Sequence, residues 1–224
     1  LRYVETHLPD FAAAGPPARL PEGNLNVVWR VPGDGGSLIV KHAPPYVAAD
    51  PEVDLDPNRI VFELRSLEAL SPKGALAHVA RPEARPPRPV YADPVNHVLV
   101  MEDLGDAPTL GRWLREGTGE KRLAHAPQLG RWLGGFIGRL HRSTQGDEEA
   151  ARQFDNRSMQ QTRHAIQYQA VGDLLRRAGV PDAGALGRRA EALGETLLGP
   201  GRCLTMGDLW PPSVLVRPEA LHLI

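Results

Sequence analysis

The sequence of 224 residues has a single cysteine, Cys203, which excludes an intrachain disulfide framework and a cysteine-rich zinc site. It has no apolar run near the roughly 18 residues that a membrane span requires. Lys and Arg number 26 against 27 Asp and Glu, and this balance leaves no basic field for nucleic acid or a membrane surface. From these absences we expect a cytoplasmic protein without nucleic-acid or membrane partners.

What is present is enough apolar material for a folded core, because 42% of the residues are hydrophobic. The chain changes from strand-rich to helix-rich at Met101–Gly105. We therefore predict an α+β protein with two lobes. The N-terminal lobe would span residues 1–101, a hinge 102–105 and the C-terminal lobe 106–224.

The N-terminal part begins with a turn-rich segment, Pro21–Asn26, that leads into two strand patterns. Val27–Val31 and Ser37–Lys41 flank the turn at Pro32–Gly36, which predicts a hairpin. Val90–Met101 predicts two further strands around a turn. We expect these strands to form an antiparallel sheet.

The spacing of apolar side chains predicts a helix over residues 59–70. Glu63 lies on the same face as those side chains, and its burial would be costly unless a cation meets it. Lys41, at the end of the preceding strand, is the candidate partner. The alternative is Arg59, one turn earlier, in a surface pair worth about 0.5 kcal/mol. The apolar face consists of Ile60, Leu64 and Leu67.

The C-terminal half carries four helical patterns separated by glycine and proline. Ser158 and Asp182 are the expected N-terminal caps of the last two. The expected helices are 110–116, 127–141, 158–178 and 182–198.

The segment Arg202–Val216 reads as a short strand, a tight loop and a second strand. Asp208 follows Gly207 on the loop, and Pro211–Pro212 stiffens the return. An ordinary turn is one interpretation of this pattern. The other is a carboxylate that a rigid loop positions for chemistry.

The order of these features resembles the protein-kinase-like fold in its small-molecule kinase branch. That branch contains aminoglycoside phosphotransferases, choline kinases and methylthioribose kinase, and the resemblance is nearest to methylthioribose kinase. It covers most of the chain, although residues 106–200 match only in helical character. The motifs that carry it are Glu22–Asn26, Leu38–Lys41 followed by Pro45–Tyr46, Arg59–Glu63, Val100–Leu104, Gly207–Leu209 and Ser213.

The resemblance implies an ATP- and Mg²⁺-dependent kinase that phosphorylates a hydroxyl of a small molecule, such as a methylthioribose-, choline- or aminoglycoside-like acceptor. The loop at Gly23, Asn24 and Asn26 would cover the nucleotide phosphates with backbone N–H groups. Lys41 would bind the α- and β-phosphates, and Glu63 would orient it. The oligomeric state is open, with a homodimer as one candidate.

The same resemblance assigns roles to the later motifs. The backbone of the hinge, from Glu102 to Leu104, would pair with the adenine edge. Asp208 would be the catalytic carboxylate that takes the proton of the acceptor hydroxyl. Ser213 would bind Mg²⁺ through its hydroxyl, as a hard oxygen donor.

Two features depart from the family pattern. Met206 stands where a histidine is usual, so packing of Met206 and Trp210 would have to hold the loop. In this family the strand after the catalytic loop leads to a second aspartate that binds Mg²⁺. The given sequence ends at Ile224, directly before the position where that aspartate is expected. From the family pattern we expect either a truncated piece or a protein that has lost this ligand. A nucleotide-binding pseudokinase or inactive fragment is the alternative function, and a protein-interaction domain on a kinase-like scaffold is a third.

Overall fold

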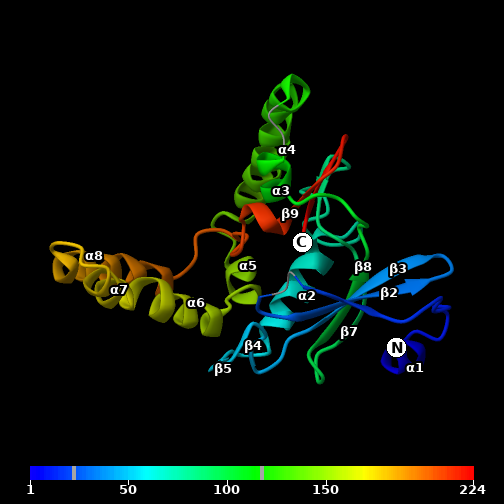
Figure 1. Cartoon of the computed structure of the whole chain (residues 1–224), viewed down its shortest axis with the longest axis horizontal. Helices are drawn as coiled ribbons and strands as arrows, with labels where there is room; N and C mark the ends of the chain where they lie inside the picture. Colours follow the sequence, from blue (N-terminus) through cyan, green and yellow to red (C-terminus); the bar gives the residue numbers. More distant parts are fainter. Residues whose placement is uncertain (22–23, 117–118) are drawn as a thin grey trace. The chain divides into compact units, whose positions relative to one another are not determined.

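The computed structural model describes residues 1–21, 24–116 and 119–224, and only the backbone of residues 120, 121 and 123. It has two compact units (Figure 1). The first unit combines Leu1–Gln145 with Cys203–Ile224, and the second is Gly146–Arg202. Among the described residues, no helix is both long enough and apolar enough to cross a bilayer. The predicted α+β class, with an N-terminal antiparallel sheet and mainly helices after it, is confirmed.

The first unit is built on a five-stranded antiparallel sheet with the order β1-β2-β3-β8-β7. The two predicted hairpins, β2–β3 and β7–β8, are both present. Gly36 has a φ of 124°, which lets the β2–β3 turn close without the penalty that a side chain would bring. The strands are β1 (Ala18–Leu20), β2 (Val27–Gly33), β3 (Gly36–His42), β7 (Pro89–Asp93) and β8 (Val98–Glu102).

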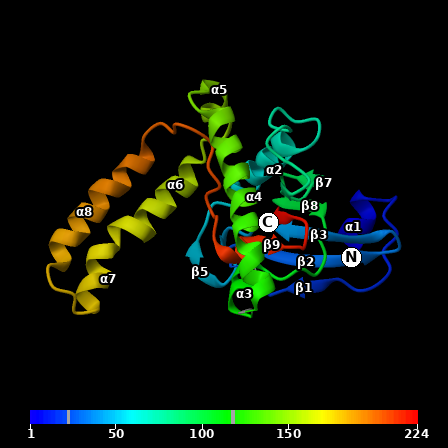
Figure 2. The same ribbon diagram turned by 90° about the horizontal axis from the view of Figure 1, so that it is seen from above.

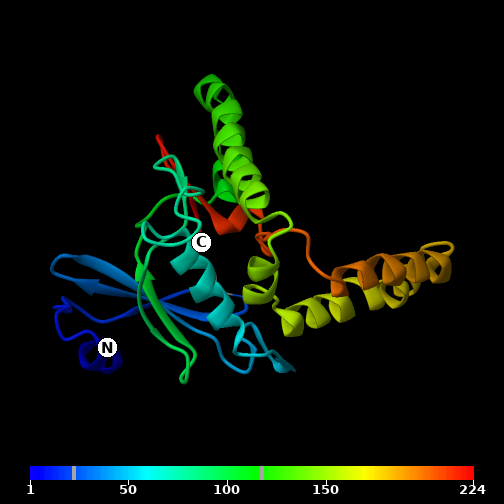
Figure 3. The ribbon, with the colours of Figure 1, turned by 180° about the vertical axis from the view of Figure 1, so that it is seen from behind.

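Strand β8 divides the core between the two faces of this sheet, because successive side chains point to opposite sides. Val98 and Val100 pack on the face covered by α1 (Arg2–His7). Leu99 and Met101 pack on the opposite face, against Ile60 and Leu67 of α2 (Arg59–Leu70). Helix α2 has the predicted bounds, and Figure 3 shows it lying along the sheet.

A second, three-stranded sheet with the order β6-β10-β9 completes the first unit. Strand β10 (Leu221–Leu223) pairs antiparallel with β9 (Val214–Val216) and parallel with β6 (Ala84–Arg85). Helix α3 (Leu110–Arg115) packs against β9, and α4 (Glu120–Thr144) packs against β6 and β10. The sequence did not predict β6, nor the small hairpin of β4 (Tyr46–Val47) and β5 (Asp50–Asp54).

The second unit consists of helices, and Figure 2 shows α8 running beside α6 and α7. Gly172 and Gly187 allow this close approach, because a Cβ on Gly187 would lie 2.6 Å from the Gly172 Cα. The elements are α5 (Glu148–Gln153), α6 (Arg157–His164), the π-helical turn η1 (Ala165–Gln169), α7 (Val171–Arg177), α8 (Ala183–Glu195) and the 3₁₀ turn η2 (Thr196–Leu198).

Several predicted helix features differ in the structure. Helix α4 begins at Glu120 rather than Pro127, because the good helix formers before the proline extend it and Pro127 is tolerated inside. The predicted helix 158–178 is capped by Asn156, whose side chain accepts from Met159 N, and not by Ser158. It is also interrupted by the π-helical turn. Asp182 is the N-cap of α8, but its side chain makes no capping bond.

The predicted strand at residues 202–206 is also wrong, since no part of this described segment forms a strand. The backbone of this segment bonds to a helix instead. Leu204 N donates to Thr144 Oγ1 at 2.8 Å, and the same hydroxyl donates to Leu140 O at 2.9 Å. Thr144 is 2% exposed, so this buried bond anchors the chain as it enters the Asp208 loop.

Candidate active site

Lys41 and Glu63 form the ion pair that the apolar spacing of α2 predicts. Lys41 Nζ donates to Glu63 Oε1 at 2.7 Å. The side chains of Lys41 and Glu63 are 19% and 29% exposed, so the pair is only partly shielded from solvent. Lys41 lies in the middle of the sheet, opposite Val28 and Leu99 on the neighbouring strands. A lysine ammonium has three N–H groups, and an anion could accept those that Glu63 does not use.

Arg59, the alternative partner of Glu63, is occupied elsewhere. Its guanidinium donates to Asn26 Oδ1 at 3.1 Å and to Leu25 O at 2.8 Å. Asn24 O accepts from Ala49 N at 2.9 Å. The segment that precedes β2 is therefore hydrogen-bonded to the rest of the first unit through Asn24, Leu25 and Asn26.

The predicted phosphate loop is described only in part. Gly23 lies outside the described residues. Asn24 is exposed and Asn26 is half-buried, with its side-chain oxygen bonded to Arg59. The assignment of Asn24 and Asn26 to nucleotide binding stays a prediction.

The side chain of Glu102, at the predicted hinge, is bound within the protein. Its carboxylate accepts from Arg85 Nη1 at 2.7 Å and Nη2 at 2.8 Å, and from Arg88 N at 3.1 Å. The Arg85 bonds hold the pKa of Glu102 below its ordinary value. Leu104 O accepts from the guanidinium of Arg217. Glu102 N donates to Arg88 O at 2.9 Å, so backbone groups at the predicted hinge are also engaged within the protein. The role of Glu102 and Leu104 toward adenine stays a prediction.

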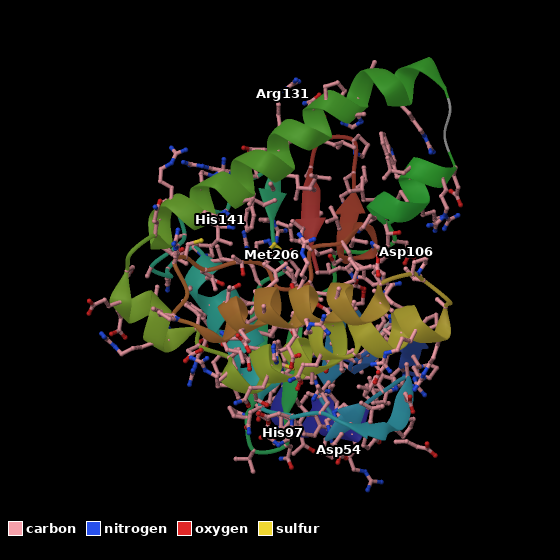
Figure 4. The ribbon with its side chains drawn as sticks, turned by 90° about the vertical axis from the view of Figure 1, so that its left-hand side faces the viewer. Asp54, His97, Asp106, Arg131, His141 and Met206 are labelled. Carbon is pink, nitrogen blue, oxygen red and sulfur yellow. The ribbon has the colours of Figure 1, made fainter. Side chains whose placement is uncertain are left out.

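Asp103, which the sequence interpretation missed, links the hinge to the β2–β3 hairpin. Its side chain is 4% exposed and lies 2.6 Å from Arg30 Nε. It also accepts from Ser37 Oγ, and from Gly105 N at 2.8 Å. Burial raises the pKa of Asp103, but these hydrogen bonds and the Arg30 charge outweigh it, so the pKa is lowered. Asp106, labelled in Figure 4, gives Arg30 a second carboxylate at 2.6 Å.

Asp208 lies on an exposed loop that is closed by Ser213. Ser213 Oγ accepts a hydrogen bond from Trp210 N at 3.2 Å. The same hydroxyl lies 2.8 Å from both Asp208 O and Trp210 O, and it can donate its proton to either. Ser213 is 7% exposed, and Ile224 N donates to its carbonyl at 2.9 Å. Within the described part of the chain, the Asp208 carboxylate has no hydrogen bond or ion pair. The loop thus presents a free carboxylate on a braced backbone, which can accept a proton from a bound hydroxyl.

The described residues do not form a metal site by themselves. They contain no group of three or more His, Cys, Asp or Glu side chains placed to share an ion. The Ser213 hydroxyl, predicted as a Mg²⁺ ligand, already bonds within the loop. Ser213 as a metal ligand stays a prediction, and the structure supports a loop-bracing role for it. Met206, labelled in Figure 4, is half-buried at the start of this loop.

Comparison with known proteins places most of the chain in one family. Residues 18–224 match the family APH, described as the phosphotransferase enzyme family. A 4-hydroxytryptamine kinase of Psilocybe cyanescens is 27% identical over 97% of the chain and 62% of its own length. A 4-hydroxytryptamine kinase of Psilocybe cubensis is 26% identical over 98% of the chain, again with 62% of its own length covered. The chain thus spans less than two thirds of these relatives. Nearness to methylthioribose kinase is not shown.

Solved structures are also similar to the chain, and one of them matches the whole chain. It is the spectinomycin phosphotransferase APH(9)-Ia in complex with ADP and spectinomycin, with 13% identity, a TM-score of 0.49 and 66% of its chain covered. This likeness is too weak to carry an argument about the site.

Proposed function

The chain belongs to the phosphotransferase enzyme family, and on that premise we propose that it transfers the γ-phosphoryl group of ATP to a hydroxyl of a small molecule. The observation that carries the proposal is a pair of features in one unit. The Lys41–Glu63 ion pair leaves a cation open to an anion. The Ser213-braced loop presents the free carboxylate of Asp208.

Lys41 supplies the nucleotide side of the proposal. Its ammonium, oriented by Glu63, would bind phosphate oxygens through the N–H groups that Glu63 leaves free. The segment at Asn24 and Asn26 would cover the phosphates. The backbone between Glu102 and Leu104 would pair with the adenine, as the resemblance of this segment to the kinase hinge implies; the Glu102 carboxylate itself is held by Arg85.

Asp208 supplies the acceptor side. The acceptor oxygen attacks the γ-phosphorus in line, and the bond from that phosphorus to the β–γ bridging oxygen breaks, which releases ADP. Asp208 orients the hydroxyl and takes its proton. A bound Mg²⁺ would neutralise phosphate charge in this chemistry. The described residues contain no group of three or more His, Cys, Asp or Glu side chains that could hold that ion.

The acceptor classes proposed are small molecules with a hydroxyl. Methylthioribose-, choline- and aminoglycoside-like compounds are the classes that the resemblance to small-molecule kinases implies. The curated relatives are named as kinases of 4-hydroxytryptamine, which adds a hydroxylated indole to the set. Cytoplasmic location and a homodimer stay predictions.

A nucleotide-binding protein without transfer is the second candidate. Two observations favour it: the described residues contain no cluster of metal ligands, and the Ser213 hydroxyl is engaged in the loop. Such a protein would keep the Lys41–Glu63 clamp and bind ATP, but would leave acceptors unchanged.

The test is a transfer assay with ATP, Mg²⁺ and one acceptor from each class, read by mass spectrometry as the gain of one phosphoryl group. ATP binding is measured in parallel by calorimetry. We expect ATP binding and phosphorylation of at least one class. ATP binding without any product would support the second candidate, and absence of ATP binding would refute both.

A further inference from the structure

Arg59 is a buried cation that holds several separate segments together. It is the first residue of α2 and is 7% exposed. Its Nη1 donates to Pro44 O at 2.9 Å and to Asp56 O at 2.9 Å, with a longer contact to Leu55 O at 3.5 Å. Its Nη2 and Nε donate to Leu25 O and to the side chain of Asn26.

The partners of Arg59 are neutral oxygens. No ion pair within 4 Å involves Arg59 in the described ranges, which leave out residues 22–23 and 117–118. Burial lowers the pKa of Arg59, and the nearby charges of Asp56 and Glu63 act against that shift. Burying a guanidinium without a carboxylate partner is costly unless hydrogen bonds satisfy its N–H groups. Here the converging carbonyl oxygens provide those bonds.

These oxygens come from three places in the first unit. Leu25 and Asn26 end the segment before β2, Pro44 follows β3, and Leu55 and Asp56 precede α2. Helix α2 also carries Glu63 one turn later, and Glu63 binds Lys41. One helix therefore fixes both the lysine and the loop that are proposed to contact phosphate.

We propose that Arg59 is a positioning residue that holds the Asn24–Asn26 loop in the geometry for nucleotide binding. This inference rests on the proposed function. Arg59 acts through the loop and does not itself touch the nucleotide, because its N–H groups are directed at protein oxygens. An arginine is required here, since its planar guanidinium offers five N–H groups in a fixed fork, whereas lysine offers three on one nitrogen.

The experiment compares wild type with Arg59→Lys and Asn26→Ala, alone and together. Arg112→Met is the matched control, because it removes an exposed guanidinium that pairs with Glu116 on its own helix. Two quantities are measured: the Kd for ADP by calorimetry, and amide hydrogen exchange of residues 24–28 and of β8 without nucleotide.

For Arg59→Lys we expect faster exchange at residues 24–28, unchanged exchange in β8 and about tenfold weaker ADP binding, as for a loop that must be ordered on binding. Arg112→Met should change neither quantity. Asn26→Ala should weaken binding less, and adding it to Arg59→Lys should give less than the sum of the two effects, because the two residues share a bond.

Unchanged exchange at residues 24–28 in Arg59→Lys would show that Arg59 does not hold the Asn24–Asn26 loop. Faster exchange with an unchanged Kd would overturn the positioning role. Wild type that binds no ADP would refute the proposed function, whereas wild type that binds ADP no better than Arg59→Lys would refute only the role of Arg59.

Discussion

Lys41 Nζ lies 2.7 Å from Glu63 Oε1, and this contact joins central strand β3 to helix α2. Strands β2 and β8 hold the lysine backbone on both sides. The carboxylate is set on the buried face of α2 by the apolar residues Ile60 and Leu67. The ammonium is therefore fixed by the core of the first unit, and it is only partly covered.

Replacing Lys41 with Met should weaken ATP binding by roughly 10–100-fold, because charge-assisted hydrogen bonds to phosphate are lost. Glu63→Gln should have a smaller effect, about 3–10-fold, since the lysine stays but loses its orienting charge. Calorimetric titration with ATP measures both, with Arg112→Met as the control. Equal binding by wild type and Lys41→Met would remove Lys41 from the nucleotide site.

Ser213→Ala should lower turnover by disturbing the Asp208 loop. The hydroxyl is buried and bonds to Trp210 N and Asp208 O, so its loss should also cost about 1–3 kcal/mol of unfolding free energy. We expect the loss of turnover to persist at saturating Mg²⁺. Full recovery of activity on raising Mg²⁺ would instead support Ser213 as a metal ligand.

Asp93 should make the stability of the first unit sensitive to acid. It accepts from Asn96 Nδ2 at 2.7 Å, from Asn96 N at 3.0 Å and from Tyr3 Oη at 2.8 Å, which ties α1 to the β7–β8 turn. The Asn96 bonds and the Tyr3 bond lower the pKa of Asp93 from 3.8 to about 2.

Between these two values the unfolded chain binds more protons at this site than the folded chain, so stability rises with pH. The contribution of Asp93 is therefore present above about pH 4 and is lost as pH falls toward 2. In urea unfolding, Asp93→Asn should be less stable than wild type at pH 7, with a difference that shrinks through this window. Asp10→Asn, at an exposed site, is the control. A difference that stays constant down to pH 2 would contradict the prediction.

The Lys41–Glu63 pair could be predicted from the sequence because the reason is local. The helix repeat places Glu63 among apolar side chains, and such a carboxylate needs a cation. The strand that carries Lys41 lies shortly before the helix in the sequence, with only the small β4–β5 hairpin between them. The β2–β3 hairpin and helix α2 followed from similarly local patterns.

The rest of the site depends on contacts distant in sequence. Arg85 lies in a proline-rich segment that resembles a loop, and it meets Glu102 where β6 pairs with β10, a strand more than a hundred residues later. The sequence contains no local sign of that pairing. Arg59 donates mostly to backbone carbonyl oxygens. Because every residue has a carbonyl, the sequence does not mark these acceptors, and Arg59 could only be interpreted as a surface partner of Glu63.

The prediction of a strand at residues 202–206 was wrong for a related reason. The apolar pattern there fits a strand, but Thr144 of α4 takes the Leu204 N–H that a neighbouring strand would have used. A side chain that replaces a strand partner leaves no periodic signal in the sequence.

The most direct test of the account is phosphoryl transfer by Asp208→Asn, measured beside wild type with an accepted hydroxyl compound and with ATP affinity determined for both. The substitution keeps the shape of the side chain but removes the charge that would accept the proton. We predict a loss of turnover of roughly 10²–10⁴-fold with ATP binding unchanged, as for a positioned acid–base group. Turnover equal to wild type would contradict the assignment of Asp208 and with it the proposed mechanism.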